Sequence, residues 1–190
     1  MEKITPILNA ARDLFAEKGF DQTPIAEIAK KAGVAGGTII YHFKSKENLL
    51  FILIRQILYS LFRQSQSETS TASNGLKAVE GYIGAFFSFM EERENDFMVL
   101  LKTNPFEVIN HKEHPNADIR LIFDGYLNLL VDAIKRGQVD GSIRDGQPAD
   151  LARSISATLF GSAQLKLVFG DSCTTLKDSA LHFTRAGLQK

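Results

Sequence analysis

The stretch AEIAKKAGVAGGTIIYHFKSKENLL, residues 26–50, decides the fold of the N-terminal region. Residues 23–46 predict a short helix, a turn at Gly33–Val34 and a second short helix, which is helix-turn-helix geometry. The turn needs a residue that tolerates a positive φ, and glycine is that residue. Apolar side chains of both helices are expected to pack onto a preceding helix. The expected contacts join Ile28, Ala29, Val34, Ile39 and Phe43 to Ile7, Ala11 and Phe15.

The preceding helix has signals at both ends. Its apolar positions between residues 7 and 15 fall on one face of a repeat of about 3.6 residues. Thr5 suits its cap, Pro6 its first turn and Gly19 the left-handed residue that ends it. Thr23 is the expected cap of the next helix.

The remaining sequence also predicts helices, separated by polar breaks. Ser45 is expected to cap a long helix through Leu61, and the Ser-, Thr- and Gln-rich residues 64–75 predict a loop or a frayed helix end. Residues 104–116 are expected to form another loop. Further helices are expected over about residues 76–92, 96–103, 117–136, 148–168 and 172–190. No segment shows strand alternation, so the predicted fold class is all-α with about nine helices.

The composition excludes several classes of protein. Lysine plus arginine equals aspartate plus glutamate, 22 against 22 in 190 residues, so a globally basic nucleic-acid coat is excluded. Cys173 is the only cysteine, which rules out an internal disulfide and favours a reducing compartment. The longest aliphatic or aromatic run, residues 49–54, is far shorter than the roughly 20 residues of a membrane span. A cytoplasmic protein without membrane attachment is expected, since the start MEKITP does not resemble a secretion signal.

Polar and cationic side chains gather at one edge of the predicted helix-turn-helix. They are Thr38, Tyr41, His42, Lys44 and Lys46. Such an edge suits contacts with phosphates and with base edges in a groove. The first 48 residues hold seven basic and six acidic side chains, so any attraction to DNA depends on placement rather than on total charge. The alternative is three small packed helices, with Lys44 in a solvated helix end.

Residues 26–50 resemble the DNA-binding domain of the TetR family of transcriptional regulators. The matches are Ala32-Gly33-Val34, Gly37-Thr38, Tyr41-His42-Phe43, Lys44-Ser45-Lys46-Glu47 and Leu49-Leu50. The resemblance implies a DNA-binding domain over residues 1–47 and an effector-binding and dimerisation domain over residues 48–190. It also implies three partners, namely a double-stranded DNA operator, a small-molecule effector and a second copy of the chain.

The matched positions imply roles for individual residues. Thr38 looks like the recognition-helix hydroxyl that meets a base edge or a phosphate, and Tyr41 and His42 occupy positions that commonly touch the DNA backbone. Lys46 resembles the lysine at the start of the fourth helix, which meets a phosphate. Thr23 resembles a helix cap that also contacts phosphate, although a plain cap fits equally well.

Two features depart from the family pattern. Ala35 and Gly36 stand where many relatives carry serine and a long side chain, and Ile40 stands where an aromatic residue is common. Adjacent glycines weaken a helix interior by about 1 kcal/mol each, and they offer no side chain that reads a base. The second short helix is therefore expected to read DNA through close backbone approach at Gly36 and Gly37, through Thr38, and through apolar contacts and groove shape.

The second part of the chain is rich in aromatic residues and methionine. Ordinary core packing explains any single one of them. Together they also fit an apolar effector pocket with a few polar groups, and the family resemblance implies a small, largely apolar effector there. The expected ligand-binding residues are Tyr82, Phe86, Phe89, Met90, Met98, Phe123, Tyr126 and Gln164.

The last two helices are expected to pair with those of a second copy. Apolar and small residues follow one stripe on each helix, which suits a four-helix interface. The expected contacts are Ile155, Leu159, Ser162, Leu176, Ala180, Phe183 and Gly187. Packing within one subunit is the alternative. A dimer places two recognition helices in successive major grooves, about 34 Å apart.

The sequence thus predicts a DNA-binding repressor that an effector releases from its operator, with the fourth helix as the lever. The alternative is a ligand-binding or scaffold protein on the same fold that does not bind DNA. No enzymatic activity, metal or cofactor is expected. His111 and His114 lie in a predicted loop and lack the i, i+4 spacing of a helical metal site, and Cys173 has no histidine close in the sequence.

Overall fold

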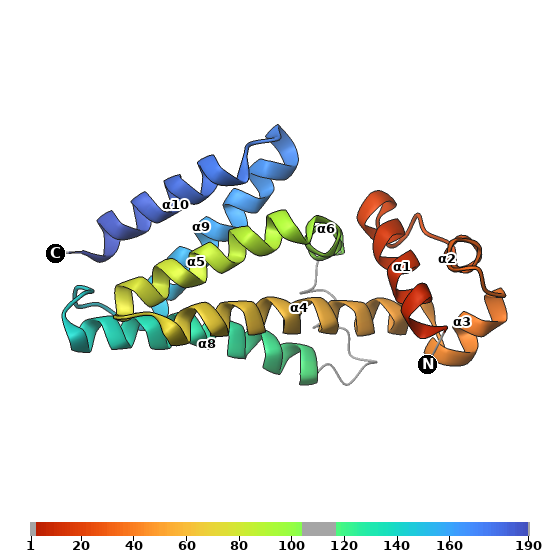
Figure 1. Cartoon of the computed structure of the whole chain (residues 1–190), viewed down its shortest axis with the longest axis horizontal. Coiled ribbons are helices and arrows are strands. Elements are labelled where there is room, and N and C mark those ends of the chain that lie inside the picture. Colours follow the sequence, from red (N-terminus) through yellow and green to blue (C-terminus); the bar gives the residue numbers. More distant parts are fainter. Residues whose placement is uncertain (1–2, 104–116, 190) are drawn as a thin grey trace. The chain divides into compact units, whose positions relative to one another are not determined.

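The computed structural model describes residues 3–103 and 117–189, and within these ranges every regular element is a helix (Figure 1). The helices are α1 (Ile4–Lys18), α2 (Ile25–Ala32), α3 (Gly36–Phe43), α4 (Lys46–Thr71), α5 (Gly75–Glu92), α6 (Glu94–Lys102), α8 (Ala117–Asp140), α9 (Pro148–Phe169) and α10 (Cys173–Leu188). The all-α prediction is confirmed. None of the described helices combines the length and the apolar character of a membrane span. The loop predicted over residues 104–116, with its two histidines, lies outside the described residues.

The chain divides into two compact units. The first takes its residues from Met1–Tyr59 and Arg93–Arg120, and the second from Ser60–Glu92 and Leu121–Lys190. α6 therefore groups with the N-terminal helices, and α4 contributes residues to both units. The functional boundary expected after residue 47 stays a prediction, because this division reflects packing alone.

In the first unit, α1 packs against both α2 and α6, and α2 packs against α3. The expected core positions of α1 are fully buried, as are Ile28 of α2 and Ile39 of α3. Phe43 is buried as well, whereas Val34 is only half-buried. The predicted packing of α2 onto α1 is confirmed, and α3 packs on α2.

Two helix starts differ from the expectation. α1 begins at Ile4 with Lys3 in the N-cap position, so Thr5 lies inside the first turn and does not cap it. α2 begins at Ile25, and Pro24 rather than Thr23 occupies the N-cap position. The carbonyl of Pro24 accepts the first backbone bonds of α2, and the fixed φ of proline suits a helix start without a side-chain cap.

α4 continues to Thr71, through most of the segment expected to be a loop or a frayed end. Its small polar side chains bond within the helix, since the hydroxyls of Ser70 and Thr71 donate to the Ser67 carbonyl at 3.0 and 3.1 Å. A Cβ on Gly81 of α5 would lie 3.2 Å from the Glu68 carbonyl oxygen, so α5 packs closely on this part of α4. Tertiary packing therefore outweighs the weak helix propensity of serine and threonine.

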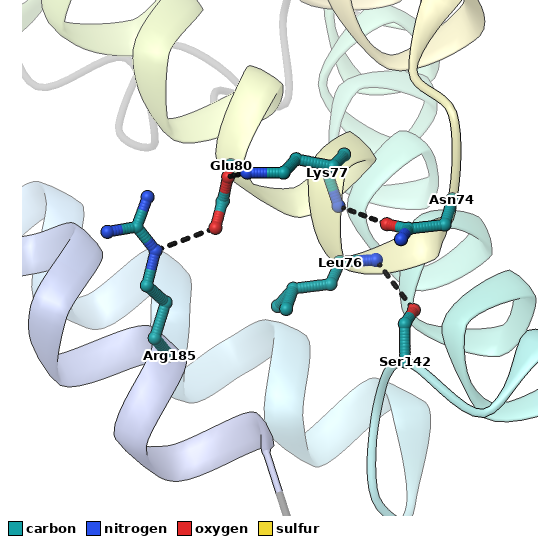
Figure 2. Close-up of polar contacts among 6 residues, drawn as sticks. All are labelled: Asn74, Leu76, Lys77, Glu80, Ser142 and Arg185. Atoms are coloured by element: carbon teal, nitrogen blue, oxygen red, sulfur yellow. Dashed lines mark hydrogen bonds and ion pairs between the residues drawn. The ribbon is translucent and has the colours of Figure 1, made fainter.

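In the second unit, α10 packs on α5 and α9 (Figure 1). Glu80 of α5 accepts hydrogen bonds from Arg185 of α10 at 2.6 Å and from Lys77 at 2.7 Å (Figure 2). Burial acts to raise the pKa of Glu80, but these two bonds outweigh burial and hold that pKa below its ordinary value. Ser142 Oγ accepts from the Leu76 backbone N–H at 3.1 Å and so satisfies a donor in the first turn of α5 (Figure 2).

Candidate functional site

Gly33 makes the turn between α2 and α3. Its φ of 67° and ψ of 32° lie in the left-handed region, where a side chain is strained. The Val34 N–H donates to the Ala29 carbonyl at 3.0 Å and completes the end of α2. Ala35 returns to extended backbone at the N-cap position of α3, with no side-chain cap. The predicted helix-turn-helix geometry is confirmed.

α3 buries one face and presents the other. Ile39 and Phe43 are buried in the first unit. The outward residues are Gly36, Gly37, Ile40, Tyr41 and His42, with Thr38 half-buried beside them. The exposed fraction of Tyr41 is 73%. The outward face of α3 therefore offers backbone, an aliphatic side chain, an aromatic side chain and an imidazole, and no lysine, arginine or carboxylate.

The two glycines of α3 have free space around them. A Cβ on Gly36 or Gly37 would meet nothing within 4 Å, and neither residue has a positive φ. Both lie in the first turn of α3, where alanine is free of strain and favours the helix by less than the roughly 1 kcal/mol of a helix interior. The described surroundings of these two residues therefore do not require glycine, and the close backbone approach expected at these positions stays a prediction.

Lys44 ends α3 in an unusual conformation. It is the one described non-glycine residue with a positive φ, at 69°. Its Nζ donates to the Tyr41 carbonyl at 3.0 Å and lies 5.5 Å from the centre of the Tyr41 ring. The ring of His42 meets that of Tyr41 edge-on, with centroids 5.1 Å apart. Tyr41, His42 and Lys44 thus form one exposed cluster around a backbone conformation that costs on the order of 1–3 kcal/mol.

Lys46 and Thr23 both stabilise the loop between α1 and α2. The Lys46 Nζ donates to the carbonyls of Phe20 and Thr23 at 3.1 and 3.3 Å and lies 4.2 Å from the Phe20 ring centre. The Thr23 hydroxyl donates to the Gly19 carbonyl at 2.7 Å, and the residue has no exposed surface. The Thr23 side chain therefore has an internal structural role, and its phosphate contact stays a prediction. Lys46 is half-buried, and its phosphate contact stays a prediction.

α6 is tied to α1 by contacts that the sequence did not reveal. Asp96 is 3% exposed and forms ion pairs with Arg12 of α1 and, at 2.5 Å, with Arg93. The Nζ of Lys102 donates to two carbonyls in the last turn of α1, at 2.7 and 2.9 Å. These carbonyls belong to the group that a helix end leaves without intrahelical partners. Charged side chains thus fasten both ends of α6 to α1.

The residues expected to bind an effector fall into three groups. Those in the interior of the second unit are Tyr82, Phe86, Phe89, Met90 and Tyr126, all buried, and Phe123, half-buried. Met98 is half-buried in the first unit. Gln164 is exposed, because its position falls on the outward side of α9. It therefore does not lie in the interior with the other expected ligand residues. For the buried residues a ligand role stays a prediction.

α9 and α10 turn a different stripe outward from the one predicted. Ile155, Leu159, Ser162, Leu176 and Ala180 are buried within the protomer, so the alternative of packing inside one subunit holds for these five. Phe183 and Gly187 are exposed. The apolar side chains exposed on these two helices are Phe160, Leu165, Leu167, Phe169 and Phe183. Phe160 and Leu167 share one side of α9, whereas Leu165 and Phe169 lie toward another, and the five together are here called the α9–α10 apolar face.

Metal-binding geometry does not occur in the described ranges. No group of three or more histidine, cysteine, aspartate or glutamate side chains gathers there in a way that would hold an ion. Cys173, at the start of α10, is buried and reduced.

The chain is similar in sequence to known bacterial regulatory proteins. Residues 7–52 match the family described as bacterial regulatory proteins, tetR family. The chain is 30% identical over 176 residues to the uncharacterized HTH-type transcriptional regulator YvkB of Bacillus subtilis, covering 87% of this chain and 83% of that protein. It is 29% identical over 160 residues to the fatty acid metabolism regulator protein of the same organism, covering 84% and 79%. The crystal structure of FadR from Bacillus subtilis in complex with stearoyl-CoA shares the fold, with a TM-score of 0.81, 24% identity and coverage of 96% and 98%.

Proposed function

The chain belongs to the TetR family of transcriptional regulators, and we propose that it is a repressor which a small, largely apolar effector releases from its DNA operator. The observation that carries the DNA-binding part is the outward face of α3. Its two glycines cost helix stability, their surroundings leave room for side chains, and no contact with the described residues requires them.

The N-terminus of α3 suits a close approach to DNA. The helix has no side-chain cap, so the first N–H groups, on Gly36 and Gly37, are not occupied by a capping residue. A helix N-terminus carries partial positive charge and attracts phosphate oxygens or base acceptors. Without side chains at these positions, the backbone itself comes within hydrogen-bond reach of the groove.

Ile40 supplies an apolar contact on the same face. Its side chain is 43% exposed, although isoleucine is among the residues most often buried. In the major groove the apolar group that a protein recognises is the 5-methyl group of thymine. Ile40 is therefore proposed to contact a thymine in each half-site.

Selection of bound duplexes from a random pool, followed by replacement of each thymine with deoxyuridine, tests this reading. Loss of one buried methyl group lowers affinity about fourfold, from about 0.8 kcal/mol. For wild type, we expect this loss of affinity when one thymine per half-site is replaced by deoxyuridine. For Ile40→Ala, we expect the replacement to leave affinity unchanged. Ile4→Ala, at an exposed position of α1, is the control and retains the loss. A protein that selects no sequence and binds duplex only weakly at low salt favours the ligand-binding or scaffold alternative instead.

The α9–α10 apolar face is proposed to pair with the same face of a second copy. Phe169 and Phe183 are 72% and 68% exposed, and aromatic side chains are typical anchors of protein interfaces. A two-fold dimer presents two α3 helices to major grooves about 34–36 Å apart. Phe183→Asp is expected to give monomers by analytical ultracentrifugation and to weaken operator binding. Val139→Asp, at a 91% exposed position of α8, is expected to stay dimeric.

Effector release is proposed to act through α4 and α6. α4 contributes residues to both units, and α6 is fastened to α1 by Asp96 and Lys102. An effector shifts the protein away from DNA only by its difference in affinity for the two states. Stearoyl-CoA, present in the similar FadR structure, is the first ligand to titrate against the operator complex. A ligand that binds tightly and leaves operator affinity unchanged contradicts this part.

A further inference from the structure

Three hydroxyl groups from three helices converge in the interior of the second unit. They belong to Ser65 on α4, Tyr82 on α5 and Tyr126 on α8. Ser65 and Tyr82 have no exposed surface, and Tyr126 is 5% exposed. The two tyrosine rings stack, with centroids 4.7 Å apart and planes 27° from parallel. The surrounding buried residues of α5 are apolar, so the hydroxyls form a small polar island, here called the hydroxyl cluster.

None of the three hydroxyl oxygens has a hydrogen-bond partner of normal geometry among the described residues. Buried hydroxyls in proteins nearly always have one, because an unmade bond costs stability. Serines in helices have an easy solution, as the bond from Ser162 to the Thr158 carbonyl at 2.9 Å shows. Ser65 does not use it. The three hydroxyls lie near one another, but no bond of normal geometry joins them. The hydroxyl cluster therefore has donors and acceptors that an added oxygen could use.

Both tyrosines are uncharged at neutral pH. Burial raises the pKa of Tyr126, although the nearby hydroxyls of Tyr82 and Ser65 act to lower it. Burial also raises the pKa of Tyr82, and Tyr126 adds to that effect. Each phenol consequently keeps an O–H that it donates to an oxygen acceptor.

The cationic side chains of the same helix segments are all exposed. In residues 60–92 and 121–140 they are Arg63, Lys77, Lys135 and Arg136. Each also bonds to its own partner: Gln66, Glu80, Asp132 and the Ala72 carbonyl, respectively. None of these four cations is therefore available to a carboxylate or phosphate beside the hydroxyl cluster, and burying such a charge without a partner is strongly unfavourable. A neutral oxygen has no such cost.

Building on the proposed function, we infer that Ser65, Tyr82 and Tyr126 form the polar end of the effector site, and that the effector carries an uncharged carbonyl or hydroxyl oxygen on an apolar body. The effector oxygen accepts from the tyrosine hydroxyls. Ser65 lies on α4, the helix that comes directly after α3 in the chain. An effector bound at the hydroxyl cluster therefore acts on a helix that leads to the proposed DNA-binding segment.

The first arm of the test measures unfolding of the full chain without added ligand. The variants are Tyr82→Phe, Tyr126→Phe and the double substitution, with Tyr59→Phe at a 52% exposed position as the control. Removing an unpartnered hydroxyl leaves the denaturation midpoint unchanged or raises it. A lowered midpoint for the two buried positions overturns the inference, since it shows that the hydroxyls already make structural hydrogen bonds.

The second arm uses three probes with one medium-length carbon skeleton: a methyl ketone, the alkane and the carboxylate. We expect wild type to bind the ketone at least about tenfold more tightly than either other probe, and the double variant to lose that preference while Tyr59→Phe keeps it. Equal binding of ketone and alkane, or tighter binding of the carboxylate, overturns the inference. Operator affinity of the same samples separates the two proposals. If wild type binds operator but does not prefer the ketone, only this inference is contradicted. If wild type does not bind operator, the proposed function is contradicted.

Discussion

Two pairs of glycines in this chain serve opposite purposes. Where α5 crosses α8, a Cβ on Gly75 would lie 2.0 Å from the backbone nitrogen of Gly137. On the outward face of α3, a Cβ on Gly36 or Gly37 would meet nothing within 4 Å. Packing dictates the first pair, whereas the second pair leaves α3 less stable than it need be. The difference distinguishes residues that the fold requires from residues that we propose are kept for contact with DNA.

Gly75→Ala is expected to have the largest effect on stability. The new methyl group collides with backbone on α8, which cannot move aside as a side chain does, so we expect a loss of about 3 kcal/mol in the free energy of unfolding. Denaturation by urea measures it. Gly84→Ala in the same helix is the matched control, since a Cβ there meets nothing within 4 Å and the change is expected to be neutral or stabilising. Equal changes in stability for Gly75→Ala and Gly84→Ala would contradict the claim that packing against α8 requires glycine at position 75.

Asp96→Asn tests a second position that the fold requires. The side chain is nearly fully buried and holds two arginines, so loss of its charge is expected to cost about 2–3 kcal/mol. Asp132→Asn, an exposed partner of Lys135 at 3.5 Å, is expected to change stability by less than about 0.5 kcal/mol. If both variants unfold at the same urea concentration, Asp96 does not fasten α6 to α1.

Lys44 is the converse of Gly36, because a side chain occupies a position where the fold prefers glycine. Lys44→Gly is expected to relieve backbone strain and to stabilise the protein by about 1 kcal/mol, even after loss of the bond to the Tyr41 carbonyl. The same change should weaken operator binding, since it removes a cation beside Tyr41 and His42. Thermal unfolding measures the change in stability, and titration of the same preparation with operator measures the change in affinity. A destabilised variant would show that Lys44 is kept for the fold.

Glu80 gives the smallest expected effect. Its folded-state pKa is lowered by the bonds from Arg185 and Lys77, so its stabilising contribution is complete above the ordinary value of 4.5 and is lost as the pH falls through the lower folded-state value. Wild type should therefore lose stability more steeply than Glu80→Gln below pH 4.5. The pKa of Asp140 is also lowered, mainly by a hydrogen bond from the Ser142 side chain and by bonds from the backbone N–H groups of Gly75 and Ser142. Because Asp140 is present in both proteins, its contribution to the pH dependence cancels in this comparison. Parallel curves would contradict the assignment.

The N-terminal region was predictable because its signals are local. The positive φ of Gly33, the buried Ile39 and Phe43 and the outward glycines all follow from spacing within about 25 residues. Thr23 and Lys46 were harder, since each could serve as a cap or as a phosphate contact. The bonds from Lys46 to carbonyls 23 and 26 positions earlier are long-range, and no spacing rule anticipates them.

In the rest of the chain, periodicity identified helices without identifying their inward faces. α9 carries apolar residues on two stripes, one with Ile155 and Leu159 and the other with Phe160 and Leu167, and only the packed structure shows that the first is buried. The ion pair between Arg12 and Asp96 joins positions far apart in the sequence, which pattern analysis does not connect. The two tyrosines of the hydroxyl cluster were among the expected ligand residues, but Ser65 lay in a segment expected to be a loop or a frayed helix end.

The most direct test of the central claim, that α3 meets DNA through its glycine face, is to measure operator affinity and unfolding free energy together for Gly37→Ala. A side chain here favours the helix but blocks close backbone approach, so we expect a protein up to about 1 kcal/mol more stable that binds operator about tenfold more weakly. Gly84→Ala, with the same open surroundings in α5, should keep full operator affinity. A Gly37→Ala protein that is stabilised and binds operator as tightly as wild type would contradict the claim.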